Sequence, residues 1–437
     1  MPPLAVLTGP ARTLLVTVFT ASLLTPLPAQ AWSVSVPGEV ELRNIAADRS
    51  GCPIVGGVRR RGGVSTVYAA KYRTDGTLLW STDNGSNPPI AGEVLDTLVD
   101  GTGDVYVTGT EGRDGDRTAP FAARFSGVDG ELVWHSLVTP TGLSEAVVEG
   151  SGETLSVGSK GQLVVGGSLR AGTQALGMVC RLSTADGTAQ WCWTSENLVV
   201  RDTAVDRTGD VVATGTFFLA VKLEGASGTE RWRATTPGGT AQGLGYPQMR
   251  SLALDKSGNV TVGGSLRETF DDTRAFYTGA FNAQTGRPLW ESAGAPLHSF
   301  EAPARLLSLG GDVLAAGRQN GSPVVLGLQA RTGKLRWRRQ AWSVDGFEDR
   351  SLGVADLATD GKCAYALGTD FPGQLLLNVY TSAGKSRWQR DLGPGQGVGL
   401  AVGVKKHLYA LARRPGIDGL DWHYVVLGVD ALTGRDL

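Results

Sequence analysis

The sequence predicts an all-β fold built from one four-stranded unit that is repeated along the chain. Composition supports this first: the 437 residues include 62 glycines, only 19% are charged, and apolar residues never recur at a sustained helical spacing. A Gly-x-x-x-Trp pattern also returns seven times, and an Asp-x-[Ser/Thr]-Gly pattern runs in step with it. Short strands joined by tight turns explain all three observations.

The Gly-x-x-x-Trp pattern predicts a hairpin followed by a short strand, as the copy from Gln329 to Trp337 illustrates. Gly333 supplies the positive φ that a tight hairpin needs, and the residues after it alternate, with Lys334 on one face and Trp337 on the other. The seven copies end at Trp80, Trp134, Trp191, Trp232, Trp290, Trp337 and Trp388.

Each Trp strand is expected to be the outermost strand of its unit. Pro288 is tolerated only at a sheet edge, and Arg231 and Arg336 place charge where an open edge would recruit another chain. The indoles are expected to face the neighbouring unit and form a packing girdle, since burying one removes roughly 150 to 250 Å² from water. The alternative is a ring of tryptophans that binds a ligand or carbohydrate, but identical placement in every repeat favours packing.

The second pattern predicts the turn that opens each unit. Clear copies begin at Asp48, Asp100, Asp206 and Asp255, and four looser copies lie at 159–161, 310–312, 360–362 and 403–405. An Asp three residues before Gly is typical of an Asx turn that bonds its own backbone, although a ring of carboxylates is the alternative. Eight turns and a period of roughly 40 to 60 residues predict an eight-bladed β-propeller of four-stranded antiparallel blades.

The two ends of the chain lead to linked predictions. Residues 1–31 have the charged, apolar and small-x-small order of a secretory signal peptide, so the protein is expected to be secreted or periplasmic, with residues 32–437 as a single domain. The last repeat, from Asp430 to Leu437, stops one residue short of its Trp. We therefore expect the strand from Trp32 to Val36 to close the ring, with Trp32 as the eighth girdle residue; a frayed N-terminal tail is the alternative.

Four cysteines allow one disulfide prediction. Cys180 and Cys192 fall opposite each other on the two strands around the hairpin at Asp186-Gly187, and an exported protein allows the bond to form. Cys52 and Cys363 occupy the same repeat position in units that are not neighbours, so they are expected to stay unpaired.

The motif Ala-x-x-Thr-Gly-x-x-x-Trp, carried almost intact at 283–290 and 330–337, resembles the tryptophan-docking motif of the pyrroloquinoline-quinone-like (PQQ-like) β-propeller repeat family. The Asp-x-[Ser/Thr]-Gly turn is similar to that of related bacterial secreted propellers. The resemblance covers essentially the whole chain after residue 31 and implies an eight-bladed propeller. The family contains quinone-dependent dehydrogenases and also cofactor-free scaffolds, such as the lipoprotein that assists outer-membrane protein assembly, so fold alone does not decide function.

Few features that the dehydrogenase branch requires are present. The resemblance implies an adjacent Cys-Cys pair against the quinone, calcium-binding Glu and Asn residues and a catalytic Asp, whereas the closest cysteines here are twelve positions apart. The four histidines lie in different repeats without metal-ligand spacing, and no Gly-x-Ser-x-Gly elbow or P-loop occurs. We therefore expect no catalytic, cofactor-binding or metal-binding residues; a PQQ-type dehydrogenase is the alternative function.

The remaining functional signal lies in the long, unequal loops that join one repeat to the next. Several blades contribute to such a face, and aromatic residues there suit recognition of a protein, peptide or glycan, although loops that only cap the blades are the alternative. Basic residues are scattered singly and the formal charge is −1, so neither nucleic acid nor an anionic membrane is an expected partner. We predict a monomeric, non-catalytic binding or assembly scaffold whose binding face carries Tyr246, His298, Phe300, Trp342 and Phe347.

Overall fold

The computed structural model describes residues 32–36, 39–83, 88–112, 117–141, 143, 147–235, 246–267, 274–293, 302–319, 322–342, 353–370, 373–416 and 422–435. The predicted signal peptide lies outside these ranges. Regular structure in them is almost entirely β, with a single short 3-10 helix at Val404–Lys406, so the all-β prediction is confirmed. No helix in the described ranges has both the length and the apolar character that crossing a membrane requires.

The described strands form six four-stranded antiparallel sheets and one sheet of eight strands. The first two sheets comprise β2 (Val40–Ala47), β3 (Pro53–Arg61), β4 (Val64–Tyr72) and β5 (Leu78–Ser81), then β6 (Gly92–Val99), β7 (Val105–Gly112), β8 (Thr118–Phe125) and β9 (Leu132–Leu137). The third comprises β10 (Val147–Val157), β11 (Leu163–Ala171), β12 (Gln174–Leu182) and β13 (Ala189–Glu196).

The eight-stranded sheet consists of two four-stranded groups that are joined by a single residue pair, Thr216 with Gln248. The first group contains β14 (Val199–Val205), β15 (Val211–Thr216), β16 (Ala220–Leu223) and β17 (Glu230–Ala234). The second contains β18 (Tyr246–Leu254), β19 (Val260–Arg267), β20 (Arg274–Phe281) and β21 (Pro288–Ala293).

The last three sheets complete the chain. Two of them comprise β22 (Ala302–Leu309), β23 (Asp312–Gln319), β24 (Ser322–Gln329) and β25 (Leu335–Gln340), then β26 (Gly353–Thr359), β27 (Cys363–Thr369), β28 (Gln374–Thr381) and β29 (Ser386–Pro394). The third combines both ends of the described chain, namely β30 (Gln396–Val402), β31 (His407–Pro415), β32 (Trp422–Asp430) and β1 (Ser33–Ser35). In it β1 pairs antiparallel with β32, and Val34 lies opposite Val426.

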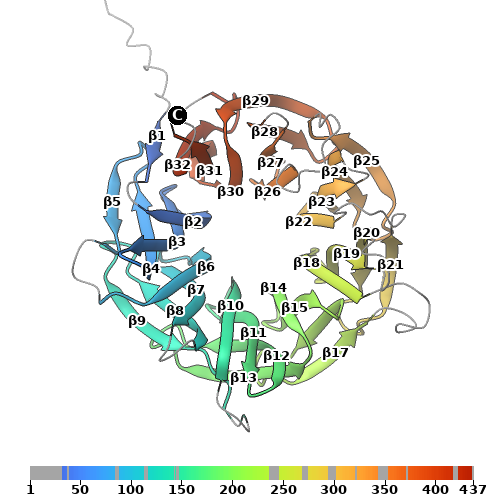
Figure 1. The fold of residues 1–437 in the computed structure, drawn as a ribbon. Coiled ribbons are helices and arrows are strands. Elements are labelled where there is room, and N and C mark those ends of the chain that lie inside the picture. The colour runs from blue at the N-terminus through green and yellow to red at the C-terminus, as the bar shows by residue number, and fades with distance from the viewer. Residues whose placement is uncertain are drawn as a thin grey trace, which may run out of the picture.

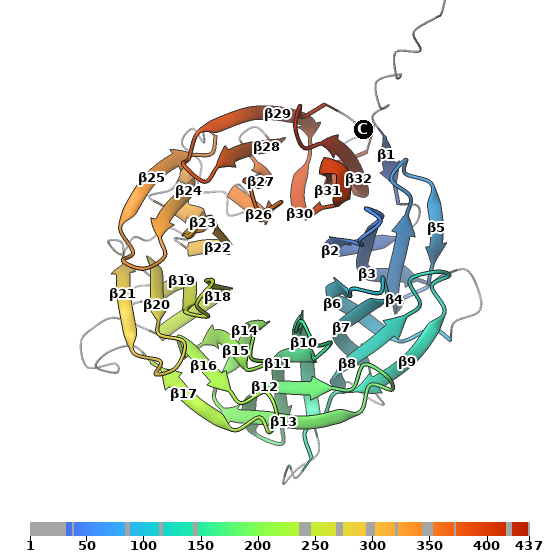
Figure 2. The same cartoon turned by 180° about the vertical axis from the view of Figure 1, so that it is seen from behind.

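The sheets stand side by side in a ring, with the first strand of each group nearest the centre (Figures 1 and 2). The hydrophobic core is divided among the interfaces between successive groups of strands. One cluster joins Ile54 and Trp80 of the β2–β5 sheet to Val107 and Phe121 of the next sheet. Another packs Val426 of β32 against Leu42 of β2, so the first and last sheets also share a core.

The glycine of each Gly-Trp hairpin packs against the indole of a tryptophan from the preceding group of strands. A Cβ atom added to Gly333 would overlap the indole of Trp290, and the same overlap recurs at the equivalent glycines. Each indole N–H then donates to a backbone oxygen beside that hairpin; for Trp290 the acceptor is the Ala330 oxygen at 2.8 Å. The eight tryptophans with this contact are Trp32, Trp80, Trp134, Trp191, Trp232, Trp290, Trp337 and Trp388.

The Asx-turn interpretation of the second pattern is confirmed. Oδ1 of Asp48 accepts the backbone N–H groups of Ser50 at 2.8 Å and Cys52 at 2.9 Å. Its other oxygen lies 2.8 Å from Nζ of Lys71, and both side chains are buried. Asp100, Asp206 and Asp255 hold their own turns in the same way, and Asp206 also pairs with a buried lysine, Lys222, at 2.8 Å.

Cys180 and Cys192 lie opposite each other on β12 and β13, with their Cα atoms 4.1 Å apart and their sulfurs bonded. Cys52 and Cys363 are free thiols. The disulfide is in the two outer strands of its sheet, so it lies away from the centre of the ring.

Candidate binding faces

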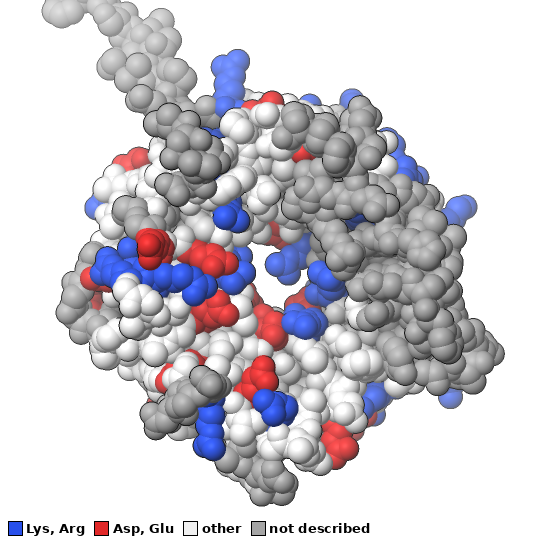
Figure 3. All heavy atoms as spheres, viewed as in Figure 1, with Lys and Arg blue, Asp and Glu red and all other residues white. Residues whose placement is uncertain are grey.

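The two ends of the strands give the ring two different faces. We call one the loop face; it carries the connections between successive sheets, such as the one that follows Ser81, and hairpins such as Arg61–Val64. The other, the turn face, carries the Asx turns and the Gly-Trp hairpins. Figure 3 views the ring from the loop face and shows acidic and basic side chains gathered around the central opening.

The connection between β5 and β6 creates a pocket on the loop face. After β5 the hydroxyl of Thr82 donates to the Val67 oxygen at 3.3 Å, and the backbone N–H of Thr82 donates to the Ala69 oxygen at 2.9 Å. The chain returns to the same strand where the N–H of Val67 donates to the Ile90 oxygen at 2.9 Å. A cavity of about 230 Å³ lies beside these two attachments.

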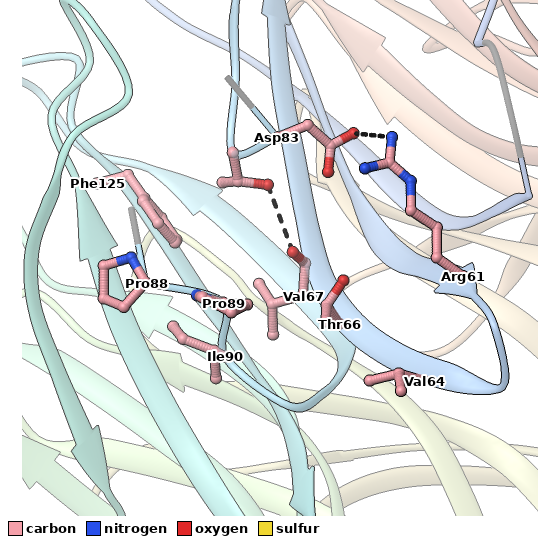
Figure 4. A pocket seen from close by; sticks show the side chains of 10 residues that line it. Arg61, Val64, Thr66, Val67, Asp83, Pro88, Pro89, Ile90 and Phe125 are labelled. Carbon is pink, nitrogen blue, oxygen red and sulfur yellow. Dashed lines mark hydrogen bonds and ion pairs between the residues drawn. The ribbon is translucent and has the colours of Figure 1, made fainter. Parts of the chain in front are cut away.

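This pocket has an apolar floor and a charged rim (Figure 4). Val67, Ile90 and Phe125 form a buried floor, whereas Val64 on the rim is 57% exposed. The other lining residues are Arg61, Thr66, Thr82, Asp83, Pro88 and Pro89. A volume of this size accommodates one side chain of a partner.

The rim keeps one cation in contact with solvent. Nε of Arg59 lies 2.5 Å from Asp83, and Arg59 is itself buried with its guanidinium 4.7 Å from the ring centre of Tyr68. Arg61 is 3.8 Å from the same carboxylate, but its side chain is 71% exposed. Arg59 therefore neutralises Asp83, and Arg61 leaves a positive charge beside the apolar pocket.

A wider groove of about 530 Å³ lies on the loop face and is lined by residues of β6, β7, β8, β10, β11, β12 and β14. Three glutamates in its wall each pair with an arginine: Glu93 with Arg43 at 3.4 Å, Glu149 with Arg170 at 3.2 Å and Glu153 with Arg201 at 3.0 Å. Because each carboxylate already has a cation, the groove presents paired polar groups, with Leu95, Leu169 and Leu176 between them.

Charged residues on the innermost strands interact across the centre. Nε of Arg305 on β22 lies 3.1 Å from Asp356 on β26, and the positions of Asp202 and Asp96 on β14 and β6 are close enough to influence it. These three carboxylates raise the pKa of Arg305, and Asp356 has the largest effect. Burial raises the pKa of Asp96 to about 6 and also raises the pKa of Asp202.

These inner carboxylates connect neighbouring groups of strands. Oδ2 of Asp96 accepts the backbone N–H of Leu155 on β10 at 2.7 Å, and Asp356 accepts that of Leu400 on β30 at 2.8 Å. Asp202 likewise accepts the backbone N–H of Leu252 on β18 at 2.8 Å. Their lone pairs are thus used in holding the ring together.

The predicted binding-face residues do not form one site in the described chain. Trp342 is corrected: it is only 5% exposed, and its indole N–H donates to the Thr369 oxygen at 2.9 Å, so it packs in the core between the β22–β25 and β26–β29 sheets. Tyr246 begins β18, but its side chain is outside the described part of the structure. His298, Phe300 and Phe347 also lie outside the described residues.

Sequence reasoning did not identify Arg61 or Arg305. Arg61 ends a strand in a run of three arginines, and nothing local shows that Arg59 is buried or that Arg61, and not the exposed Arg60, borders the pocket. For Arg305 a signal was available, because it stands one residue after the β-bulge of its inner strand, where Asp96, Asp202 and Asp356 stand in other repeats. Among the described residues, no cluster of His, Cys, Asp and Glu has the geometry of a metal site.

Comparison with known proteins gives a family and a fold. Residues 175–345, less than half of the chain, match the model of a PQQ-like repeat family described as outer membrane protein assembly factor BamB. None of the curated proteins matches the chain.

Several solved propeller structures are similar over nearly the whole chain. The Dos1 propeller is 8% identical, with 91% of this chain and 94% of that chain covered and a TM-score of 0.58. Quinohemoprotein alcohol dehydrogenase from Comamonas testosteroni is 12% identical, with 93% and 77% covered and a TM-score of 0.55. Chaetomium thermophilum Sqt1, bound to the N-terminus of ribosomal protein L10, is 12% identical, with 90% and 98% covered and a TM-score of 0.51. At these identities the similarity shows the fold alone.

Proposed function

Because this chain belongs to the PQQ-like β-propeller repeat family, we propose that it is an exported, non-catalytic binding or assembly scaffold that recognises a protein partner through its loop face. The pocket beneath Pro88 and Pro89 is the observation that carries this proposal. Its floor is apolar, and the exposed Arg61 guanidinium lies on its rim. A partner segment with one apolar side chain next to a carboxylate matches both features.

The proposal includes a ring of eight blades that the N-terminal strand closes. The single Thr216–Gln248 pair supports counting β14–β17 and β18–β21 as two blades, since each group has its own hairpin glycine and tryptophan. The pairing of β1 with β32 and the contact of Trp32 with Gly76 support closure. Such a closed ring would hold the loop face rigid, which limits the entropy lost when a partner binds.

The dehydrogenase alternative does not fit the described side chains. The family's quinone requires adjacent cysteines, whereas Cys180 and Cys192 bond across β12 and β13 in the outer half of a sheet. The inner carboxylates that could face a cofactor are occupied, because Asp96, Asp202 and Asp356 accept backbone N–H groups from neighbouring strands. We therefore derive no quinone chemistry.

Site-specific crosslinking tests the proposed face. A photo-crosslinking amino acid in place of Pro89 should give a discrete adduct in cells that make the protein, whereas the same group in place of Leu335, which is 50% exposed on an outer strand, should not. Arg61→Glu and Val64→Asp should each abolish the Pro89 adduct, because they reverse the rim charge and make the rim polar. Equal labelling at both positions, or quinone binding with dye-linked oxidation by the purified protein, would contradict the proposal.

A further inference from the structure

More exposed cations lie on one half of the turn face than on the other, where Arg49, Arg73, Lys160 and Arg207 are also exposed. In four consecutive groups of strands, the residue that follows the hairpin glycine is basic. These residues are Arg287, Lys334, Lys385 and Arg435, and all four are exposed. In the other four groups the equivalent residues are Thr77, Glu131, Thr188 and Thr229, so none of them is basic.

Three more cations stand nearer the centre of the same half. Lys256, Lys362 and Lys406 project from the turns between the first and second strands of their groups, and each is exposed. We call these three residues and the four hairpin cations the basic crescent. In Figure 2, which views the turn face, the hairpins before β21, β25 and β29 follow one another along one arc of the ring, next to β32.

In the described part of this half, the acidic residues in or beside the turns are Asp255, Asp312, Asp360 and Asp430, which are fewer than the seven cations of the crescent. Asp360 accepts the backbone N–H of Lys362 at 2.8 Å. Asp255 accepts the backbone N–H groups of Ser257 and Asn259, and Asp430 accepts those of Leu432 and Thr433. Asp312 is buried against Arg336 at 3.1 Å. No ion pair joins a crescent residue to any other residue in the part of the chain that the structure describes. Basic residues that stand singly in the sequence thus lie on one face and one half of the ring.

Two aliphatic side chains protrude beside the crescent. Leu432 is 48% exposed at the hairpin that also carries Arg435, and Val404 is 40% exposed at the turn that carries Lys406. Cations at the tips of one face together with protruding aliphatic residues suit the interface of a bilayer, where lysine and arginine attract anionic headgroups and apolar side chains enter the acyl boundary. Single-stranded nucleic acid is instead bound by stacking on aromatic side chains in a groove, and neither the crescent nor the two tips contains an aromatic residue.

We propose that the basic crescent docks the protein on an anionic lipid surface, with Leu432 and Val404 inserted at the headgroup layer. The docked ring would lie with its turn face on the membrane and its loop face turned away. The proposal is independent of the loop-face pocket, because the two surfaces lie at opposite ends of the strands.

Vesicle sedimentation with a matched pair of variants tests this docking. The first variant replaces Arg287, Lys334, Lys385 and Arg435 with Gln. The control replaces Arg49, Arg73, Lys160 and Arg207 with Gln; these are four exposed cations of the turn face outside the crescent. Both lose the same charge, and thermal melts should show that both stay folded.

The wild type should bind vesicles that contain about a third phosphatidylglycerol and should be released at about 0.5 M salt, where charges are screened over a few ångströms. At about 1 kcal/mol for each basic residue near the surface, the crescent variant should bind at least about a hundredfold more weakly, and the control should lose much less. Leu432→Ser should further reduce binding at intermediate salt. Equal loss in both variants, no binding by the wild type, or tighter binding to an oligonucleotide than to vesicles would overturn the proposal.

Discussion

The indole Nε1 of Trp32 lies 2.5 Å from the carbonyl oxygen of Thr74, so the first described residue is bonded to a hairpin 42 positions later in the chain. The same ring covers Gly76, and its own backbone oxygen accepts the N–H of Gly428 at 3.2 Å. Trp32 thereby contacts both the first and the last sheets. It occupies the place that a tryptophan from the preceding sheet occupies at every other hairpin of this kind.

Trp32→Ala should destabilise the protein by about 3 to 5 kcal/mol, the usual cost of removing a packed tryptophan. Denaturant titration of the protein that begins at residue 32 measures the change. Trp422→Ala is the control, because Trp422 is 39% exposed and contacts Arg413 mainly through its ring face, so its loss should cost about 1 kcal/mol or less. Closure by this strand is rejected if removal of residues 32–36 leaves the unfolding midpoint unchanged.

Two glycines separate the backbone role of the hairpins from their packing role. Gly333 has a φ of 67° and lies under the Trp290 ring, whereas Gly63 has a φ of 80° and no neighbouring atom near the position of a Cβ. Gly63→Ala should cost about 1 to 2 kcal/mol for the left-handed backbone alone. Gly333→Ala should cost that and about 1 to 3 kcal/mol more, because the new methyl group displaces the indole. Equal unfolding free energies for the two variants would show that the Trp–Gly contact contributes nothing.

Residues with a repeated local pattern were the ones that sequence could place. Gly333 and Trp337 are set by a hairpin only a few residues long, so their roles follow from spacing. Trp342 was placed wrongly because its burial depends on Gly368 and Thr369, which lie on another sheet. Its position just after a strand gave no sign of that contact.

The candidate surfaces were harder to predict for the same reason. The loop-face pocket exists because Thr82 and Ile90 both bond to β4, and neither bond has a sequence signature. The basic crescent is visible in the sequence only after the repeats are aligned on their hairpin glycines, since Arg287 and Arg435 are far apart in the chain. The composition and net charge of the whole chain average over both halves of the ring, so they do not reveal the basic crescent.

The Cys180–Cys192 bond should contribute a modest amount of stability. It closes a loop with a sequence separation of 12, so reducing it should lower the free energy of unfolding by on the order of 3 kcal/mol at most. The measurement compares denaturant midpoints with and without a reductant for the wild type and for Cys180→Ser. The wild type should respond to the reductant and Cys180→Ser should not; Cys363→Ser, which removes a free thiol, should keep the wild-type response.

Asp96 should make stability depend on pH in an unusual direction for a carboxylate. Burial raises its pKa from 3.8 to about 6, even though the N–H of Leu155 and the charge of Arg305 act in the opposite sense, and Asp202 adds to the increase. Between these two values the folded protein holds a proton on Asp96 that the unfolded chain has released. The contribution of this residue to stability is therefore largest below about pH 4, falls as the pH rises, and is lost once the pH exceeds about 6.

Asp96→Asn removes this titration while keeping the shape of the side chain. Relative to the variant, the wild type should lose on the order of 2 kcal/mol of unfolding free energy between about pH 4 and pH 7. Asp129→Asn is the control, because Asp129 lies in a hairpin on the turn face and hydrogen bonds lower its pKa, so the window near pH 6 should not change. Urea titrations across this range decide the matter: a constant difference between the wild type and Asp96→Asn would mean that Asp96 is ionised throughout and that Arg305 compensates fully for its burial.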